Sequence, residues 1–223
     1  MKTFGRRGGR ALSTRQHNLI ETLLPKLRPP AASAQTLDPS TLFDGASEVW
    51  LEIGFGGGEH VTGQAIRHKD IGILACEVFQ EGIAKCLGQI AEAGLTNVCV
   101  WDDDARDLMQ SLASDSVDRV FILFPDPWPK ARHQKRRLIQ PDFLSALARI
   151  VKPGGCVRFA TDVRSYADEA LVRFLAHGRY RWRATCAADW RDVPSDHIPT
   201  RYQLKNLGDI RPVYYDFEVI GST

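Results

Sequence analysis

Carboxylates stand near the ends of three successive apolar segments in the first half of the chain. Glu52 lies near the end of the first segment and precedes a glycine-rich run that contains Gly54 and Gly56. Glu77 ends the second segment, and Asp104 belongs to the Asp-Asp-Asp-Ala run that follows the third. Glycine permits a tight turn and lets a ligand lie against bare backbone, so this pattern predicts a pocket for a small ligand.

The same residues distinguish between two kinds of nucleotide ligand. The third glycine of a GxGxxG dinucleotide fingerprint would fall at Glu59, so that fingerprint fails. A carboxylate at Glu52 would repel a pyrophosphate, whereas it suits a ligand with an ammonium and a sulfonium, as in S-adenosyl-L-methionine. Glu77 comes nineteen residues after Gly58, where an acid accepts hydrogen bonds from ribose hydroxyls. Asp104 is expected to take the adenine amino group, with capping of the next helix as the alternative.

A proline-braced turn follows the fourth apolar segment, in the run FPDPWPK. Two prolines bracket Asp126 and hold its carboxylate rigidly where the methyl group of the ligand is expected to emerge. Trp128 offers a face on which a base could stack, and the alternative is a stiff loop packed by its tryptophan. This turn is therefore the expected substrate side of the pocket.

Basic residues are segregated along the chain, although the net charge is only +2. Residues 1–30 carry seven basic groups against one acid, and the octet 130–137 carries five against none. Such segregation is the electrostatic footprint of a polyanion partner, most often a nucleic acid, and the alternative is a solvated tail and loop.

The elements that must position these residues alternate between strands and helices. The expected strands are 49–53, 71–77, 98–101, 119–124, 155–161 and 213–220, and the expected helices are 59–68, 80–93, 105–113, 141–151 and 165–177. This alternation predicts an α/β fold with a doubly wound, mostly parallel sheet, and the alternating last strand predicts an antiparallel edge. In such a sheet, ligands bind outside the carboxyl ends of the strands.

The chain of 223 residues, 43% of them hydrophobic, is long enough for one large domain. We expect a basic, flexible N-terminal arm over residues 1–45, with at most one short helix near 16–24, and a single domain over residues 46–223. No apolar stretch is long enough to span a membrane, and the amino terminus lacks the apolar core of a secretory signal. A cytoplasmic protein is therefore expected.

Cysteine and histidine give no support for a disulfide framework or a metal centre. The five cysteines are far apart without a CxxC pair, and the six histidines never form HxH or HxxxH. We therefore expect small buried thiols and no metal.

Four motifs together resemble the bacterial tRNA (guanine-N7-)-methyltransferase family. They are EIGFGGG, FPDPWPKARHQKRR, ATDV and TRYQ, and the similarity spans about residues 48–220. The resemblance implies a Rossmann-like domain that uses S-adenosyl-L-methionine to methylate N7 of a guanine in the variable loop of tRNA. It also implies that Glu52, Glu77, Asp104 and Asp126 contact the cofactor, with Asp126 the active-site residue.

The resemblance also implies a substrate-binding set. Its members are Lys130, Asp162, Thr200, Arg201, Tyr202 and Gln203. Family members often have Glu at the last position, and an amide there would both donate and accept hydrogen bonds. Within the octet, Arg132, Arg136 and Arg137 are expected to hold phosphates together with Lys130 and Lys135. Asp162 could instead cap the helix that follows it.

The chemistry of guanine N7 limits what the protein must supply. N7 keeps an in-plane lone pair at neutral pH, so no general base is needed, and catalysis is mostly positioning of a direct displacement. Asp126 would accept hydrogen bonds from the guanine N1–H and amino group or offset the positive charge that arrives on the ring. The target guanine must be unstacked before it can react.

Three other functions remain open from the residues alone. The Pro-Asp-Pro-Trp turn is similar in shape to the (D/N)PP(Y/F/W) loop of amino-methyltransferases, although it interrupts the paired prolines. A non-catalytic RNA-binding protein on the same fold is the second alternative, and a nicotinamide dehydrogenase is a distant third. The oligomeric state, monomer or homodimer, is not determined by the sequence.

Overall fold

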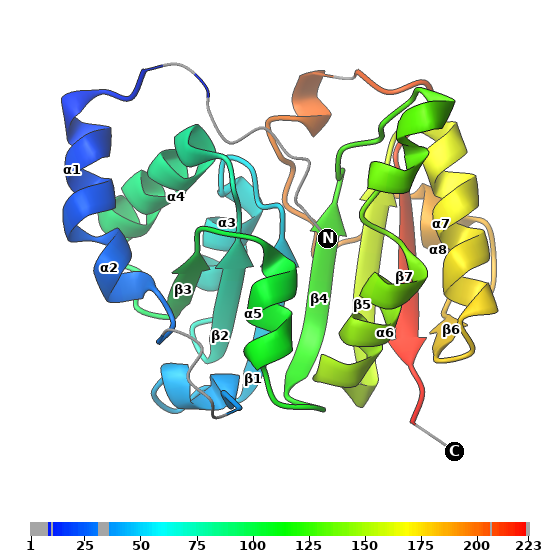
Figure 1. Ribbon diagram of the computed structural model, residues 1–223, viewed down its shortest axis with the longest axis horizontal. Helices are drawn as coiled ribbons and strands as arrows, with labels where there is room; N and C mark the ends of the chain where they lie inside the picture. The colour runs from blue at the N-terminus through cyan, green and yellow to red at the C-terminus, as the bar shows by residue number, and fades with distance from the viewer. Residues whose placement is uncertain (1–8, 10, 31–35, 206, 222–223) are drawn as a thin grey trace.

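The computed structural model describes residues 9, 11–30, 36–205 and 207–221. Within these residues one sheet contains seven strands (Figure 1). The strands are β1 (Glu48–Ile53), β2 (Ile71–Cys76), β3 (Val98–Trp101), β4 (Val117–Leu123), β5 (Val151–Thr161), β6 (Tyr180–Trp182) and β7 (Val213–Val219). Their order across the sheet is β3-β2-β1-β4-β5-β7-β6.

The pairing confirms the mixed, mostly parallel sheet. Strands β3, β2, β1, β4 and β5 are parallel, and β7 is antiparallel to both β5 and β6. The short strand β6, which the sequence pattern did not indicate, lies outside β7. From β1 the chain adds β2 and β3 on one side and then β4 and β5 on the other, so the strand order reverses between β1 and β4. This is the switch point where such sheets bind ligands.

Helices connect the strands much as the apolar periodicity indicated. The connecting helices are α3 (Glu59–Arg67), α4 (Gln80–Ala93), α5 (Ala105–Ser111), α6 (Pro141–Ile150) and α7 (Arg164–Ala176). Shorter elements are α8 (Ala188–Arg191) and the 3-10 segments η1 (Pro39–Leu42), η2 (Ala131–Arg136) and η3 (Gln203–Lys205). Local residues set several ends: Pro141 occupies the first turn of α6, and Gly94 ends α4 with φ +60°.

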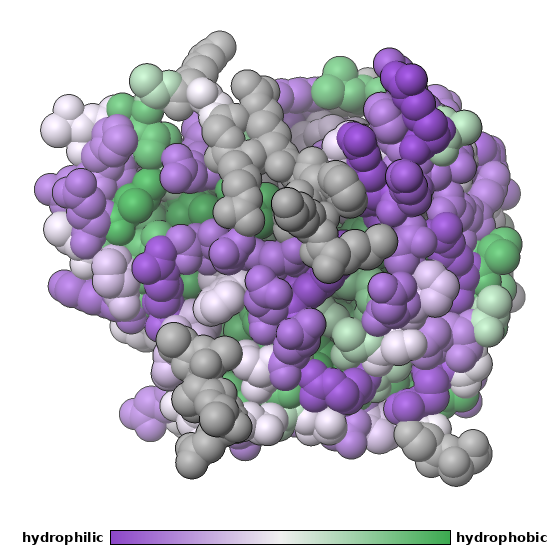
Figure 2. All heavy atoms as spheres, in the orientation of Figure 1, coloured by the Kyte–Doolittle hydropathy of each residue, from purple (hydrophilic) through white to green (hydrophobic). Residues whose placement is uncertain are grey.

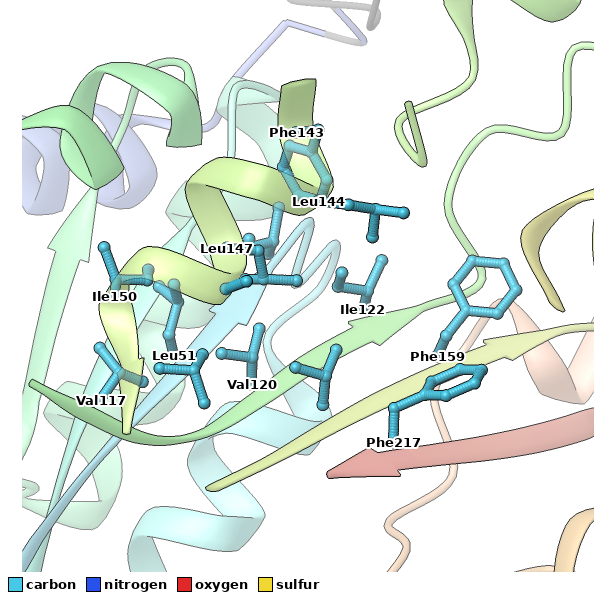
Figure 3. Packing of buried hydrophobic residues seen from close by; sticks show 14 of the residues in the cluster. Leu51, Val117, Val120, Ile122, Phe143, Leu144, Leu147, Ile150, Phe159 and Phe217 are labelled. Atoms are coloured by element: carbon cyan, nitrogen blue, oxygen red, sulfur yellow. The ribbon is translucent and has the colours of Figure 1, made fainter. Parts of the chain in front are cut away.

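Two apolar clusters fill the two faces of the sheet. Alternation along β1 sends Leu51 to one cluster and Trp50 to the other. Helices α5, α6 and α7 pack on the Leu51 face, and α3 and α4 pack on the Trp50 face. Figure 3 shows residues of α6 directed at the strands on the Leu51 face, namely Phe143, Leu144, Leu147 and Ile150. The two cores fix the strand ends, and with them the residues that follow each strand.

The N-terminal segment is more ordered than the sequence indicated in the part that the structure describes. Two short helices, α1 (Thr14–Thr22) and α2 (Leu24–Leu27), lie beside α4 and β3 (Figure 1). Leu24 is buried in the Trp50-face cluster, and the Arg28 guanidinium donates two 2.6 Å hydrogen bonds to the carboxylate of Asp102. The basic residues at 2, 6, 7 and 10 lie outside the described residues, and the division at residue 45 stays a prediction.

An irregular segment takes the place of a helix on part of the Trp50 face. Residues 192–202, which follow α8, contain turns and extended backbone. Their side chains contact Arg119 of β4, Arg158 of β5 and Tyr214 of β7. We call residues 192–202 the cover segment, because it lies over these strands on the part of the Trp50 face that α3 and α4 leave uncovered.

Candidate active site at the carboxyl edge of the sheet

The glycine-rich loop after β1 has the conformation that only glycine adopts readily. Gly54, Gly56 and Gly58 have φ of +79°, +57° and +85°. A Cβ atom on Gly54 or Gly56 would meet nothing within 4 Å, so open space lies over these two residues. At Gly82 a Cβ would come within 2.2 Å of the Gly56 carbonyl oxygen, so α4 can approach the loop only because it has a glycine there. Gly82 was not among the residues singled out from the sequence.

Glu77 lies directly after β2 and holds this loop. Its Oε2 accepts a 2.7 Å hydrogen bond from the Gly56 N–H, and its Oε1 accepts from the N–H groups of Val78 and Phe79. Burial raises the pKa of the Glu77 carboxyl, and the negative charge of Asp126 adds to this rise. The carboxylate therefore organises the loop, and its predicted hydrogen bonds to ribose hydroxyls would use the remaining lone pairs.

Glu52 lies inside β1 and is 2% exposed. Alternation along the strand points it toward α3, where its Oε2 is 2.6 Å from Nδ1 of the fully buried His60. With Nδ1–H donating to Glu52, His60 Nε2 accepts from the side-chain amide of Gln64. The sequence did not indicate this histidine as a partner. One Glu52 oxygen is thus occupied, and contact between Glu52 and a cofactor stays a prediction.

Asp104 caps the helix that follows it, which was the alternative role that we considered for this residue. It is the N-cap of α5, where its Oδ1 accepts from the Arg106 N–H at 3.0 Å. The Arg106 guanidinium also approaches its Oδ2 at 3.1 Å. The structure thus shows a capping role for Asp104, and its contact with adenine stays a prediction.

The turn after β4 presents Asp126 on strained backbone. Phe124 and Trp128 have φ of +52° and +43°, which residues with a side chain rarely adopt. Asp126 lies between these two residues in the chain and is exposed as a whole. Partial burial of its carboxyl group nevertheless raises the pKa of that group. Non-glycine residues keep such a conformation only where the surrounding structure imposes it. The turn therefore holds Asp126 in a fixed place after β4, beside the switch point, where its charge acts on Glu77.

The basic octet divides into an outer and an inner part. Lys130, Arg132 and Lys135 are exposed. Strongly hydrophilic side chains gather over η2, at the upper right of Figure 2. The Arg136 guanidinium lies 5.0 Å from the centre of the Trp128 ring. A base that stacks on Trp128 would therefore share the ring with this arginine.

Arg137 corrects one of our expectations. It is 1% exposed, and its guanidinium donates to the carbonyl oxygens of Pro127 and Ser165 and to the carboxylate of Glu169. A side chain buried in this way cannot hold an RNA phosphate. The charge pattern alone failed here because a run of basic residues does not reveal which member turns inward.

The TRYQ motif reaches the same edge of the sheet. Arg201 Nε is 3.4 Å from the carboxylate of Glu59, the first residue of α3 after the glycine loop. The Tyr202 ring lies 5.7 Å from that of Phe124, and its hydroxyl is 3.4 Å from Asp162 after β5. The chain fold thus brings together motifs that are far apart in the sequence.

Asp162 is 5% exposed and does not cap α7, whose N-cap Val163 has no side-chain hydrogen bond. Its backbone oxygen instead accepts from the N–H groups of Asp209 and Ile210. A Cβ on Gly208 would clash with Asp162 at 2.2 Å, so a glycine is needed where this loop passes. The capping alternative is therefore wrong, while a substrate contact stays a prediction.

Gln203 points inward in the structure. Its Oε1 accepts a 2.7 Å hydrogen bond from Nε2 of His197, and its Nε2 donates to the hydroxyl of Tyr214. Thr200 Oγ1 accepts from the Gln203 N–H at 3.3 Å, which closes the turn of the motif. Both ends of the amide are engaged with protein groups, so the structure does not support the expected hydrogen bond from Gln203 to a base. Sequence reasoning missed His197, a lone histidine without a motif.

Asp196 fastens the cover segment to the sheet. Its two carboxylate oxygens lie 2.6 Å from the guanidinium groups of Arg119 and Arg158, and its backbone oxygen accepts from Gln64 Nε2 at 2.8 Å. Partial burial raises the pKa of this carboxyl, but the hydrogen bond from Arg158 and the charge of Arg119 outweigh it and lower the pKa to about 2.

This shift predicts how stability responds to acid. A carboxyl group with a lowered pKa stabilises the fold above its ordinary pKa of 3.8, and that stabilisation is lost as the pH falls from about 4 toward 2. We expect Asp196→Asn to lower the free energy of unfolding by about 2 kcal/mol at neutral pH and by about half as much at pH 3. Urea unfolding of both proteins at the two pH values measures this, and equal losses at both would contradict it.

The described residues contain neither a candidate metal site nor a candidate membrane-spanning helix. In the part of the chain that the structure describes, no group of three or more His, Cys, Asp or Glu side chains is placed to hold a metal ion. Among the same residues, no helix has the length and apolar character needed to cross a membrane.

Comparison with known proteins identifies the family of this chain. A family model described as "Putative methyltransferase" matches residues 46–214. A tRNA (guanine-N(7)-)-methyltransferase of Hyphomonas neptunium is 53% identical over 219 residues, which cover 98% of this chain and 100% of that protein. A protein of the same name from Caulobacter vibrioides is 47% identical over 217 residues, which cover 97% of this chain and 94% of its own length.

A solved structure shares the fold. The antibiotic-resistance methyltransferase Kmr matches with a TM-score of 0.58 at 18% identity, over 83% of this chain and 93% of that one. At that identity the likeness concerns the fold alone. Sequence identity near one half over almost the entire length goes further, and it shows that this chain belongs to the tRNA (guanine-N(7)-)-methyltransferase family.

Proposed function

We propose that this chain transfers the methyl group of S-adenosyl-L-methionine to N7 of a guanine in tRNA, in the variable loop. The proposal rests mainly on one observation in a chain of this family. Glu77 holds the glycine loop and is close enough to Asp126 to sense its charge, at the switch point of the sheet. The names of the relatives supply the substrate, and a tRNA substrate is consistent with a cytoplasmic enzyme.

The pocket fits the cofactor on two counts. The space over Gly54 and Gly56 is open, so a ligand can lie against the loop backbone. The acids around it, Glu52, Glu77 and Asp126, suit a cofactor with a positively charged sulfonium. When bound, S-adenosyl-L-methionine supplies an activated methyl group for direct displacement. We expect Glu77 to hold the ribose, and Asp104 to accept from adenine while it caps α5.

The other residues of the proposed site position the guanine. Asp126 accepts hydrogen bonds from N1–H and the exocyclic amino group, and its negative charge offsets the positive charge that methylation places on the ring. The Tyr202 hydroxyl is 3.4 Å from Asp162, and its ring lies 5.7 Å from that of Phe124, so we expect these residues to limit where the base can lie. No proton need be removed before attack, so these residues orient the base and stabilise charge.

The outer part of the octet is the proposed phosphate-binding surface, which we define as the exposed Lys130, Arg132 and Lys135 together with the half-buried Arg136. Changing one of the first three to Ala is expected to lower the slope of log Kd for tRNA against log salt by about 0.7–0.9. Fluorescence titrations across a salt series measure the slope. Lys69→Ala is the control, since it removes an exposed lysine between α3 and β2, at the opposite edge of the sheet. Unchanged slopes in all three variants would mean that this surface faces away from the RNA.

One experiment tests the proposed function directly. The protein is incubated with methyl-labelled cofactor and unmodified bulk tRNA, and the RNA is then digested to identify the labelled nucleoside. We expect N7-methylguanosine, which is cleaved by mild base after reduction. A label on an exocyclic amine would indicate the amino-methyltransferase alternative. Failure to bind the cofactor in calorimetry would indicate a non-catalytic RNA-binding protein.

A further inference from the structure

The buried Arg137 has no part in the chemistry derived so far, and its contacts converge on the turn that carries Asp126. Its Nε donates a 2.8 Å hydrogen bond to the carbonyl oxygen of Pro127, the residue next to Asp126. On its other side, Nη1 donates to the Ser165 carbonyl oxygen at 3.0 Å and Nη2 to the Ser165 hydroxyl at 2.9 Å. One planar group thus ties the turn after β4 to the first turn of α7.

Charge and packing keep the guanidinium in place. The Glu169 carboxylate pairs with Nη1, and the guanidinium carbon lies 4.9 Å from the centre of the Tyr166 ring. The Tyr166 hydroxyl in turn accepts from the N–H groups of Leu138 and Ile139, which follow Arg137 in the chain. The Nη1 and Nη2 atoms thus have their partners on α7, while Nε has its partner on the turn.

The turn needs such a support because its backbone is strained. Trp128, directly after Pro127, has φ +43°, and Phe124 has φ +52°. Conformations of this kind persist only where neighbouring groups impose them. Arg137 supplies a charged donor to the carbonyl of Pro127, the residue between Asp126 and the strained Trp128.

We propose that Arg137 is a positioning residue for methyl transfer, which fixes the Pro127 carbonyl and thereby the direction of the Asp126 carboxylate. The inference rests on the proposed function, since it assigns a support to the proposed active-site residue. Arg137 touches neither base nor phosphate, and its effect is on the rate at saturating substrate. Misplacement of a reacting group by about 1 Å can cost a hundredfold in rate.

The test compares Arg137→Met with Arg137→Lys. Methionine fills part of the space without a donor, and lysine keeps the charge but cannot reproduce the planar fork. We expect both to lower kcat for tRNA methylation by at least tenfold, with the Kd values for S-adenosyl-L-methionine and tRNA within about threefold of the wild type. The salt slope of tRNA binding is expected to be unchanged in Arg137→Met. If Arg137→Met does not fold, Arg137→Lys carries the test.

Arg149→Met is the matched control. Arg149 also donates to two backbone carbonyls, those of Met109 and Leu112, but it lies at the end of α6 and does not contact the turn. We expect a comparable drop in melting temperature and an unchanged kcat. A merely structural Arg137 would resemble Arg149, with lost stability and unchanged kcat.

Two results would overturn the inference while the wild type remains active. One is an unchanged kcat in both Arg137 variants. The other is a fall of the salt slope by about 0.7–0.9 in Arg137→Met, which would indicate a phosphate contact. An inactive wild-type protein would instead refute the proposed function, so the two failures are distinguishable.

Discussion

Replacing Asp126 with Asn is expected to lower kcat for tRNA methylation by a hundredfold or more and to change the affinity for S-adenosyl-L-methionine far less. The amide removes the negative charge that offsets the charge on the methylated ring, and its NH₂ group opposes the two guanine donors. Loss of one preorganised electrostatic contact costs about a hundredfold to a thousandfold in rate. Single-turnover kinetics with labelled cofactor measure the chemical step, and calorimetry measures the affinity.

The pH profile provides a second readout for Asp126. Burial raises the pKa of its carboxyl above the ordinary 3.8. Activity that needs the carboxylate is therefore lost as the pH falls through this raised pKa, and the Asn variant should lack that acid limb. Asp44→Asn is the control, because Asp44 is exposed in a turn before β1. A normal rate in Asp126→Asn would leave the turn with a structural role only.

Glu77→Gln is expected to weaken binding of S-adenosyl-L-methionine by about a hundredfold. The carboxylate accepts hydrogen bonds from three backbone N–H groups, and an amide would turn a donor toward at least one of them. Hydrogen bonds to a charged group contribute about 1.5–3 kcal/mol each, and the ribose contacts would be lost together with the loop geometry.

Calorimetry with the cofactor alone measures the effect of Glu77→Gln without the complication of RNA. Glu92→Gln is the control, since Glu92 is exposed on α4 and, among the described residues, pairs with the surface Arg15. Surface pairs of that kind contribute little. An unchanged affinity in Glu77→Gln would show that the ribose lies elsewhere.

The fold was predictable where the signal is local. Apolar runs located the central strands, and Pro141 and Asp104 marked helix starts with their own side chains. The acids at the strand ends followed from the rule that ligands lie beyond the carboxyl ends of parallel strands. These features depend on residues close in the chain, so they can be recognised without the tertiary structure.

Other features depend on partners far along the chain. Arg137 reaches α7, Gln203 reaches Tyr214, and Glu52 meets His60 only because β1 turns one face to α3. The octet and the TRYQ motif therefore did not indicate which of their side chains face the solvent. The strained turn at Phe124 and Trp128 likewise has no local sequence signal beyond its prolines.

The cover segment has a consequence for how the protein would fail under acid stress. A helix in that place would keep its own ladder of backbone hydrogen bonds, but residues 192–202 are fastened by contacts such as those of the Asp196 carboxylate with Arg119 and Arg158 and of its backbone oxygen with Gln64. Protonation of Asp196 would weaken this attachment, but the pKa of its carboxyl is about 2, whereas the pKa values of Glu77 and Asp126 are raised. On acidification the acids of the cofactor pocket should therefore lose their charge first, so methyl transfer should fail while the cover segment is still in place.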